Sequence, residues 1–331
     1  MVDLSMKKSK VITPRILTIG EPLVVNPGSL QVIGGAELNV AKNLVDLGNH
    51  AEYVTKLGND ENNDAIWEFL LNNNIGIQYV QTISTHPTGY MTKAENAKGG
   101  MGIKYFRKGS AASTIDPNYV DDINLEQYDA LHLTGIFPSL SDDTYEATKH
   151  LMNKANFYRL LTTFDSNLRL GGDGNPLIYR STEEMIRKTN ELAFMSDVFM
   201  PGLKEARTLT GLHDEDDIAN FYLYGGAKNI VLKRGGMDGA YAISESNREI
   251  VNSFGVPYVI DKVGAGDACA AGTIDGLLRG LSLAESAERG CAASAMQLMS
   301  RADNGGIKSQ RHLEEFMIES RQKQASGEWT K

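Results

Sequence analysis

A glycine pair followed directly by an acid, Gly264-Ala265-Gly266-Asp267, is the feature that most constrains the fold of this 331-residue chain. Apolar residues upstream predict a strand over 256–260, and small residues downstream predict a helix that opens at Asp267. The start of such a helix leaves backbone N–H groups without partners and carries partial positive charge, and glycine removes the Cβ atoms that would keep an anion away. The sequence therefore predicts a strand–turn–helix unit that binds an anion.

Asp267 lies inside this predicted anion site, where a carboxylate does not help to hold phosphate. It would serve in a site that transfers a phosphoryl group to a hydroxyl, because a base is needed there to take the hydroxyl proton. Two other interpretations stay open from these residues alone. One is a dinucleotide-binding turn, although Cys269 stands where its third glycine would be. The other is an ordinary helix N-terminus with an aspartate cap.

Segments with strand-like and helix-like patterns alternate along most of the chain. Strands are expected over residues 15–25, 51–57, 130–136, 160–164, 198–200 and 229–233, with a hairpin over 240–244 and 249–251. Helices are expected over residues 36–47, 63–71, 142–154, 181–195, 203–210, 216–224, 283–299 and 311–323, and Ser181 is the expected cap of the fourth. Such alternation predicts an α/β fold in which helices cover both faces of a mostly parallel sheet.

The alternation stops between residues 79 and 111. Three short strand-like runs, over 79–83, 89–94 and 102–107, follow one another without a helical pattern between them. Together with residues 23–33 they predict a small antiparallel sheet that projects from the main body. Such a sheet beside a pocket is usually a lid or a dimer surface, and a simple edge hairpin is the alternative.

The acidic composition excludes some classes of partner. The chain has 33 basic and 42 acidic side chains, a formal charge of −9, so we expect no surface for nucleic acid or anionic membrane. No apolar run reaches the length of a membrane span. Cys269 and Cys291 lack C-x-x-C spacing, and a reducing cytoplasmic location is the simplest interpretation. Residues 1–10 are basic and polar, and we expect a disordered N-terminal extension there.

The run from Asp261 to Asp267, DKVGAGD, resembles the D-T-x-G-A-G-D signature of the ribokinase-like (PfkB-type) carbohydrate kinases, with Lys262 in place of the usual Thr. The resemblance extends over nearly the whole chain. It implies one kinase domain over residues 11–325, a ribokinase-like three-layer α/β/α sandwich with a small β-sheet lid over 23–33 and 79–111. It also implies that Asp267 is the catalytic base and that the backbone amides of Gly264, Ala265 and Gly266 form an anion hole.

Four further matches concern the sugar, and two of them are the D-x-N-x-R run over 165–169 and Asp303, which matches a residue that contacts substrate in the acid-sugar kinases. Residues 34–39, GGAELN, are similar to the family's N-terminal signature, whose residues hydrogen-bond sugar hydroxyls; a tight turn is the alternative. The run from Tyr105 to Ala111 resembles the Y-x-R-x-G-S-A stretch of the 2-keto-3-deoxygluconate kinase branch, whose Tyr and Arg hold the acid sugar. An arginine there would grip a carboxylate with two parallel hydrogen bonds, although an exposed cation is an alternative. The substrate-binding residues implied by all four matches are Gly35, Ala36, Glu37, Asn39, Tyr105, Arg107, Arg169 and Asp303.

The nucleotide side is implied by weaker matches. The D-x-N-x-R run over 165–169 follows an apolar strand, where ligands of open α/β sheets bind, and Lys233-Arg234-Gly235 resembles the start of a nucleotide loop that is one residue longer here. Glu205 matches a family residue linked to magnesium, with a role through water, but Gly202 stands where Asn is usual. The cofactor-binding residues implied are Asn167, Arg169, Lys233, Gly235, Gly239, Gly264, Ala265 and Gly266.

These resemblances imply an ATP- and Mg²⁺-dependent kinase for an acid sugar such as 2-keto-3-deoxygluconate, and a homo-oligomer formed through the lid sheet. Two alternatives stay open. The chain would be a kinase for a neutral sugar (fructose, ribose) or a nucleoside, or a non-catalytic sugar-binding regulator. Gly202 slightly favours the regulator, whereas Asp267 argues against it because a pure binder needs no base.

Overall fold

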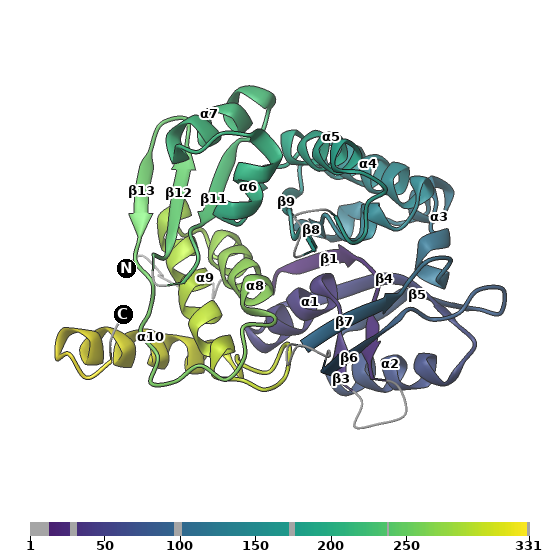
Figure 1. The fold of residues 1–331 in the computed structure, drawn as a ribbon, viewed down its shortest axis with the longest axis horizontal. Coiled ribbons are helices and arrows are strands. Elements are labelled where there is room, and N and C mark those ends of the chain that lie inside the picture. The colour runs from purple at the N-terminus through teal and green to yellow at the C-terminus, as the bar shows by residue number, and fades with distance from the viewer. Residues whose placement is uncertain (1–12, 27–31, 96–100, 172–175, 237, 330–331) are drawn as a thin grey trace, which may run out of the picture.

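The structure of the chain is a computed structural model that describes residues 13–26, 32–95, 101–171, 176–236 and 238–329. The expected disordered extension, residues 1–10, lies outside the described residues. Within them the central sheet has nine strands, in the order β13-β12-β11-β10-β9-β8-β1-β4-β5 (Figure 1). The strands are β1 (Arg15–Ile19), β4 (His50–Gly58), β5 (Gly76–Ile83), β8 (Ala130–Thr134), β9 (Leu161–Asp165), β10 (Val198–Phe199), β11 (Asn229–Lys233), β12 (Ala240–Ser244) and β13 (Arg248–Val251).

The sheet is parallel from β11 to β5, and β12 and β13 add an antiparallel hairpin at one edge. Its inner strands are almost fully buried on both faces, as expected for parallel strands covered on two sides. One helix layer holds α1 (Ala36–Asp46), α2 (Glu61–Asn72), α8 (Ala265–Leu278), α9 (Leu283–Leu298) and α10 (Gln310–Ala325). The other holds α3 (Pro117–Asp121), α4 (Asp142–Phe157), α5 (Thr182–Phe194), α6 (Leu203–Thr210) and α7 (Glu215–Gly225). The predicted three-layer α/β/α sandwich is therefore confirmed.

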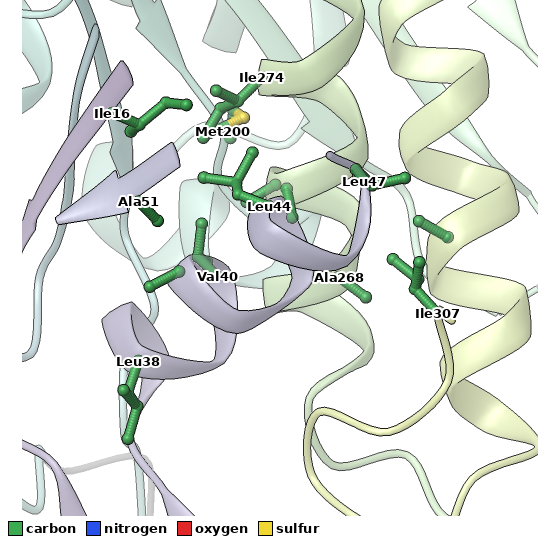
Figure 2. Close-up of a cluster of buried hydrophobic side chains, with 14 of the residues drawn as sticks. Ile16, Leu38, Val40, Leu44, Leu47, Ala51, Met200, Ala268, Ile274 and Ile307 are labelled. Atoms are coloured by element: carbon green, nitrogen blue, oxygen red, sulfur yellow. The ribbon is translucent and has the colours of Figure 1, made fainter. Parts of the chain in front are cut away.

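Two apolar cores fill the space between the sheet and these layers, because successive strand residues point to opposite faces. On β1, Ile16 belongs to one core and Leu17 to the other. In the first core, Leu44 of α1 and Ile274 of α8 pack with Ile16 and with Ala51 of β4 (Figure 2). The helices α1 and α8 therefore lie side by side on the sheet, although more than half of the chain separates them in sequence.

The structure contains the predicted small sheet, but the strands that form it differ from the prediction. It has the order β3-β2-β6-β7, with β2 (Leu23–Val25), β3 (Val32–Gly34), β6 (Tyr90–Glu95) and β7 (Met101–Phe106). The expectation of a purely antiparallel sheet is wrong, because β2 and β6 pair in parallel. The expectation that residues 79–83 join it is also wrong: they lie in β5 and pair with β4 in the central sheet. Helix α2 provides the crossover that brings β5 parallel to β4.

The predicted strand over 256–260 is not formed, and this expectation is wrong as well. The segment runs along the end of α9, where the amide of Ile260 donates to the carbonyl of Leu298 at 2.7 Å. Helix α8 begins at Ala265 rather than at Asp267, with Gly264 as its N-cap. Across the described ranges, no helix has the length and apolar character needed to cross a membrane.

Candidate active site

A cavity of about 790 Å³ opens at the carboxyl ends of the central strands, between the small sheet and the N-terminus of α8. This is the edge of an open α/β sheet where ligands bind. All the predicted site residues except Glu37 line it. They are Gly35, Ala36, Asn39, Tyr105, Arg107, Asn167, Arg169, Glu205, Lys233, Gly235, Gly239, Gly264, Ala265, Gly266, Asp267 and Asp303. Motifs that are far apart in sequence thus line the same cavity.

Asp267 lies in the first turn of α8 and is 6% exposed. Its two oxygens accept hydrogen bonds from two amides, Oδ2 from Asn39 Nδ2 at 2.7 Å and Oδ1 from Asn167 Nδ2 at 3.0 Å. The carboxylate is not the N-cap of its own helix, because Gly264 holds that position and the two oxygens of Asp267 accept from side chains of other segments. The interpretation of Asp267 as an ordinary cap is therefore wrong.

A second amide fixes the orientation of the first. Asn304 Nδ2 donates to Asn39 Oδ1 at 2.9 Å, so the Nδ2 of Asn39 faces Asp267. Asn167 reaches the carboxylate from a backbone with φ of 41°, a conformation that asparagine tolerates better than most residues. Burial raises the pKa of Asp267, while Asn39, Arg169 and Asn167 act in the opposite direction. Asp267 is therefore a stronger proton acceptor than a surface aspartate.

The turn before α8 has a conformation that requires glycine. Gly264 has φ of 77°, and a Cβ there would lie 1.8 Å from the backbone oxygen of Asp303. Next along the turn, a Cβ on Gly266 would lie 3.7 Å from Lys233 Nζ. A lysine ammonium thus lies beside the amides of the first helical turn. The helix dipole and the side-chain cation both place positive charge at this turn, which is consistent with the anion site that the sequence predicts and leaves it a prediction.

Lys233 is paired with Asp165, which was not among the predicted site residues. Lys233 Nζ donates to Asp165 Oδ2 at 2.5 Å, and the carboxyl is 1% exposed. Burial raises the pKa of Asp165, and the positive charge of Lys233 opposes that rise. The pair joins the ends of β9 and β11 at the floor of the cavity.

Both carboxylate oxygens of Glu205 accept hydrogen bonds from other residues of the chain. Its Oε1 accepts from the amide of Leu168 at 2.7 Å, and its Oε2 accepts from Ser166 Oγ and the amide of Gly202, both at 2.8 Å. The glycine in place of Asn leaves α6 intact, because Glu205 closes the helix N-terminus. No group of three His, Cys, Asp or Glu side chains in the described part of the chain is arranged to hold a metal ion. A magnesium role for Glu205 stays a prediction, with its two oxygens already engaged.

Glu37 does not face the cavity. Asn39 faces the cavity, and a residue two positions away on a helix is rotated by about 200°, so Glu37 points toward the sheet. There it is fully buried, and its Oε1 accepts from Thr134 Oγ1 at 2.5 Å. Burial raises the pKa of Glu37 to about 7. The structure gives no contact between Glu37 and the cavity that would support the predicted sugar-binding role.

The end of the cavity beneath the small sheet holds Arg107, which is 7% exposed. Its Nε forms an ion pair with Glu21 Oε2, and Ser110 Oγ donates to Glu21 Oε1. The guanidinium carbon lies 5.6 Å from the centre of the Tyr105 ring. Glu21 was missed in the sequence because the predicted strand over 15–25 runs through it, whereas β1 ends at Ile19 and Glu21 lies beyond its carboxyl end.

The opposite end is apolar and was also missed. Phe254, Val256, Val259, Val263 and Leu298 line it, and Val263 is 37% exposed. The apolar run that predicted a strand therefore forms a cavity wall. Apolar walls with a few convergent polar groups are typical of sites for small molecules and cofactors.

Comparison with known proteins agrees with this geometry. A sequence model of the pfkB family carbohydrate kinases matches residues 17–309. The chain is 32% identical over 290 residues to the 2-dehydro-3-deoxygluconokinase of Bacillus subtilis, covering 87% of each protein. It is 28% identical over 316 residues to that of Thermoproteus tenax, covering 91% of this chain and 94% of the relative. The crystal structure of a PfkB protein from Polaromonas sp. JS666 is similar at a TM-score of 0.78 and 31% identity, covering 91% of this chain and 99% of the other.

Proposed function

The chain belongs to the pfkB family of carbohydrate kinases and is a sugar kinase, and from that premise we propose that it transfers the terminal phosphoryl group of ATP to 2-keto-3-deoxygluconate, giving the 6-phosphate. The observation that carries the proposal is that a buried cation, Arg107, and a buried carboxylate, Asp267, line the same cavity. One group suits the acid end of the sugar and the other suits its far hydroxyl.

Asp267 acts as the general base in this proposal. Its carboxylate takes the proton of the 6-hydroxyl as the sugar oxygen forms a bond to the terminal phosphorus, and the bond to the ADP oxygen breaks. The pKa of Asp267, raised by burial, brings it closer to the working pH than that of an exposed aspartate. The two amides that hold its oxygens favour the ionised form and fix its position.

The anion turn and Lys233 stabilise the transferring group. The amides of Ala265, Gly266 and Asp267 lie at the N-terminus of α8, and Lys233 lies beside them. Their positive potential offsets negative charge that develops on the phosphoryl oxygens. The nucleobase would occupy the apolar end near Phe254 and Val259, beyond the Gly235 and Gly239 loop.

Magnesium would be held mainly by phosphate oxygens and water. The ion keeps several waters and needs only one or two protein carboxylates in phosphoryl-transfer sites. Asp165 and Glu205 both line the cavity, and each is bound to protein donors. When bound, the ion supplies charge neutralisation on the phosphates.

The acid-sugar assignment is supported by Arg107, Tyr105 and the relatives. A neutral sugar offers no negative group to a buried guanidinium, whereas a carboxylate accepts two parallel hydrogen bonds from it. The two relatives described above are named for phosphorylation of 2-dehydro-3-deoxygluconate, the same compound as 2-keto-3-deoxygluconate.

A second copy of the chain would bind the outer face of the small sheet. Side chains alternate along a strand, so Phe106 points away from the cavity that Tyr105 lines. Phe106 is 36% exposed and stacks on Tyr90 with 4.4 Å between ring centres. Analytical ultracentrifugation of wild type and Phe106→Glu tests this: a dimer that the variant converts to monomer supports it, and a monomeric wild type refutes it.

The substrate assay uses the purified chain, ATP, magnesium and a panel of 2-keto-3-deoxygluconate, fructose, ribose and a nucleoside, with ADP release as the signal. We expect the acid sugar to have the highest kcat/KM, and the product to carry phosphate on its terminal carbon. A higher kcat/KM for a neutral sugar or nucleoside would refute the substrate assignment. Sugar binding by calorimetry without any turnover would instead support the regulator.

A further inference from the structure

We propose that Glu21 is a positioning residue that sets the orientation of Arg107, so that the guanidinium presents its two Nη groups to the carboxylate of the substrate. The inference rests on the proposed function, because it concerns how that acid sugar is recognised. The sequence motifs do not assign Glu21 any role.

Glu21 is buried, and both of its oxygens are engaged by the segment that follows β7. It is 1% exposed, Oε2 accepts from Arg107 Nε, and Oε1 accepts from Ser110 Oγ. The surrounding backbone leaves little freedom: a Cβ on Gly89 would lie 2.5 Å from Glu21 Oε1. The carboxylate is therefore fixed from several sides before any ligand binds.

This arrangement decides which edge of the guanidinium stays available. A guanidinium has five N–H donors, one on Nε and four on the two Nη atoms. Glu21 takes the Nε donor with one oxygen, and Ser110 keeps the other oxygen occupied. Among the described residues, no hydrogen bond is recorded for the Nη atoms of Arg107, which lines the cavity. The free edge is the one that binds a carboxylate with two parallel bonds.

Glu21 also ties Arg107 to the central sheet. It lies two residues beyond the end of β1, whereas Arg107 directly follows β7 of the small sheet. A buried guanidinium without a partner carries a large desolvation cost and would turn toward another acceptor or solvent. The ion pair removes that cost in the free enzyme, so less ordering is needed when the sugar binds.

Two opposing effects of Glu21 determine whether its removal raises or lowers KM for the sugar. The negative charge of Glu21 weakens the attraction of Arg107 for a carboxylate, whereas the orientation that it imposes strengthens binding. If orientation is the larger effect, Glu21→Ala raises KM for 2-keto-3-deoxygluconate by about 10- to 100-fold, the size expected for a lost charged hydrogen bond. Glu21→Gln keeps a carbonyl oxygen for Arg107 Nε and should keep KM within about threefold of wild type.

The experiment measures KM for the sugar, KM for ATP, kcat and thermal unfolding for wild type, Glu21→Ala, Glu21→Gln, Ser110→Ala, Arg107→Ala and the double variant Glu21→Ala/Arg107→Ala. We expect the sugar KM alone to change, with Ser110→Ala a few-fold above wild type by freeing Oε1 to compete for Nη. We also expect the double variant to match Arg107→Ala, because the two residues act as one unit.

An unchanged or lower sugar KM in Glu21→Ala, additive effects in the double variant, or an equal rise in the ATP KM would overturn the inference. If Glu21→Ala does not fold, the sugar KM of Ser110→Ala is the deciding measurement. A wild-type sugar KM in that variant overturns the inference. Failure of the proposed function is distinct: wild type would not prefer the acid sugar, or Arg107→Ala would leave its KM unchanged, and the inference would fall with it.

Discussion

Asn39 Nδ2, on α1, donates a hydrogen bond of 2.7 Å to Asp267 Oδ2, on α8. The two residues are 228 positions apart, and both are almost fully buried. The bond exists because α1 and α8 pack side by side with both N-termini at the cavity. The N-terminal motif thus contributes directly to the orientation of the proposed base. This contact could not be predicted from either motif alone.

Replacement of Asp267 by Asn removes the proposed proton acceptor and keeps the size of the side chain. We expect kcat to fall by about 10²-fold or more, with sugar affinity retained. Steady-state kinetics together with calorimetric binding of the sugar measure both quantities. Asp122→Asn, at an exposed position, is the matched control and should behave like wild type. Near-normal turnover of the Asp267 variant would remove it from the base role.

Asn304 should act on Asp267 through Asn39. In Asn304→Ala the Asn39 amide loses its fixed orientation, so its hydrogen bond to the carboxylate weakens. That bond favours the ionised form, and its loss raises the pKa of Asp267 further. The acidic limb of the kcat/KM profile should therefore move to higher pH, with activity recovering as the pH rises. A uniform loss of activity at all pH values would contradict this mechanism.

Arg107 is expected to determine the preference for acid sugars. Arg107→Ala removes both Nη groups, so KM for 2-keto-3-deoxygluconate should rise by about 10-fold or more while KM for ATP stays unchanged. Arg107→Lys keeps the charge without the planar pair of donors and should recover only part of the affinity. The measurement is KM for the acid sugar and for fructose in each variant. Equal discrimination between the two sugars in Arg107→Ala and wild type would exclude the carboxylate assignment.

The sheet and its helices could be predicted because their signals are local. Ser181 precedes α5 and accepts a hydrogen bond from the amide of Glu184 at 3.2 Å, as the sequence indicated. The prediction of a strand over 256–260 was wrong because an apolar run has the same composition in a strand as in a cavity wall. Only the distant partner decides between them, and here Leu298 binds the backbone of Ile260 instead of a neighbouring strand.

The site could be predicted where a motif carries its own geometry, as at Gly264 and Asp267. The predicted sugar-binding role of Glu37 finds no support in the cavity lining, because membership of a motif does not imply exposure to the ligand and the helical rotation from Asn39 turns Glu37 toward the sheet. Glu21 and Asn304 were missed for another reason. Their importance comes from Arg107 and Asn39, contacts that form only when distant segments fold together.

Glu37 should make the stability of the protein depend on pH. Its pKa is raised from 4.5 to about 7 by burial, so the folded chain holds this proton more tightly than the unfolded chain. The stabilisation is complete below about pH 4.5 and is lost as the pH rises to about 7, a decrease of about 3 kcal/mol. Glu37→Gln stays neutral, so urea unfolding should show a smaller decrease between about pH 5 and about pH 8. Glu61→Gln, at an exposed position, should keep the wild-type slope, and an equal slope in Glu37→Gln would contradict the assignment.

Asp275 should support the helix that carries Asp267. It is fully buried in α8 and accepts from Arg279 Nε at 2.9 Å, Arg289 Nη2 at 2.6 Å and Asn49 Nδ2 at 2.9 Å. Asp275→Ala leaves the buried guanidinium of Arg289 with only a longer contact, 3.8 Å from Glu314, so the free energy of unfolding should fall by about 3–5 kcal/mol.

Denaturant unfolding measures this change, and Glu315→Ala is the control because it breaks only the exposed pair between Glu315 and Arg311 on α10. Exposed pairs of this kind contribute little, so the control should unfold like wild type. The Asp275 variant should still turn over at low temperature, because Asp275 does not line the cavity and the folded fraction keeps its site. Wild-type stability in Asp275→Ala would show that the two arginines find other partners, and the cluster would then have no part in holding α8.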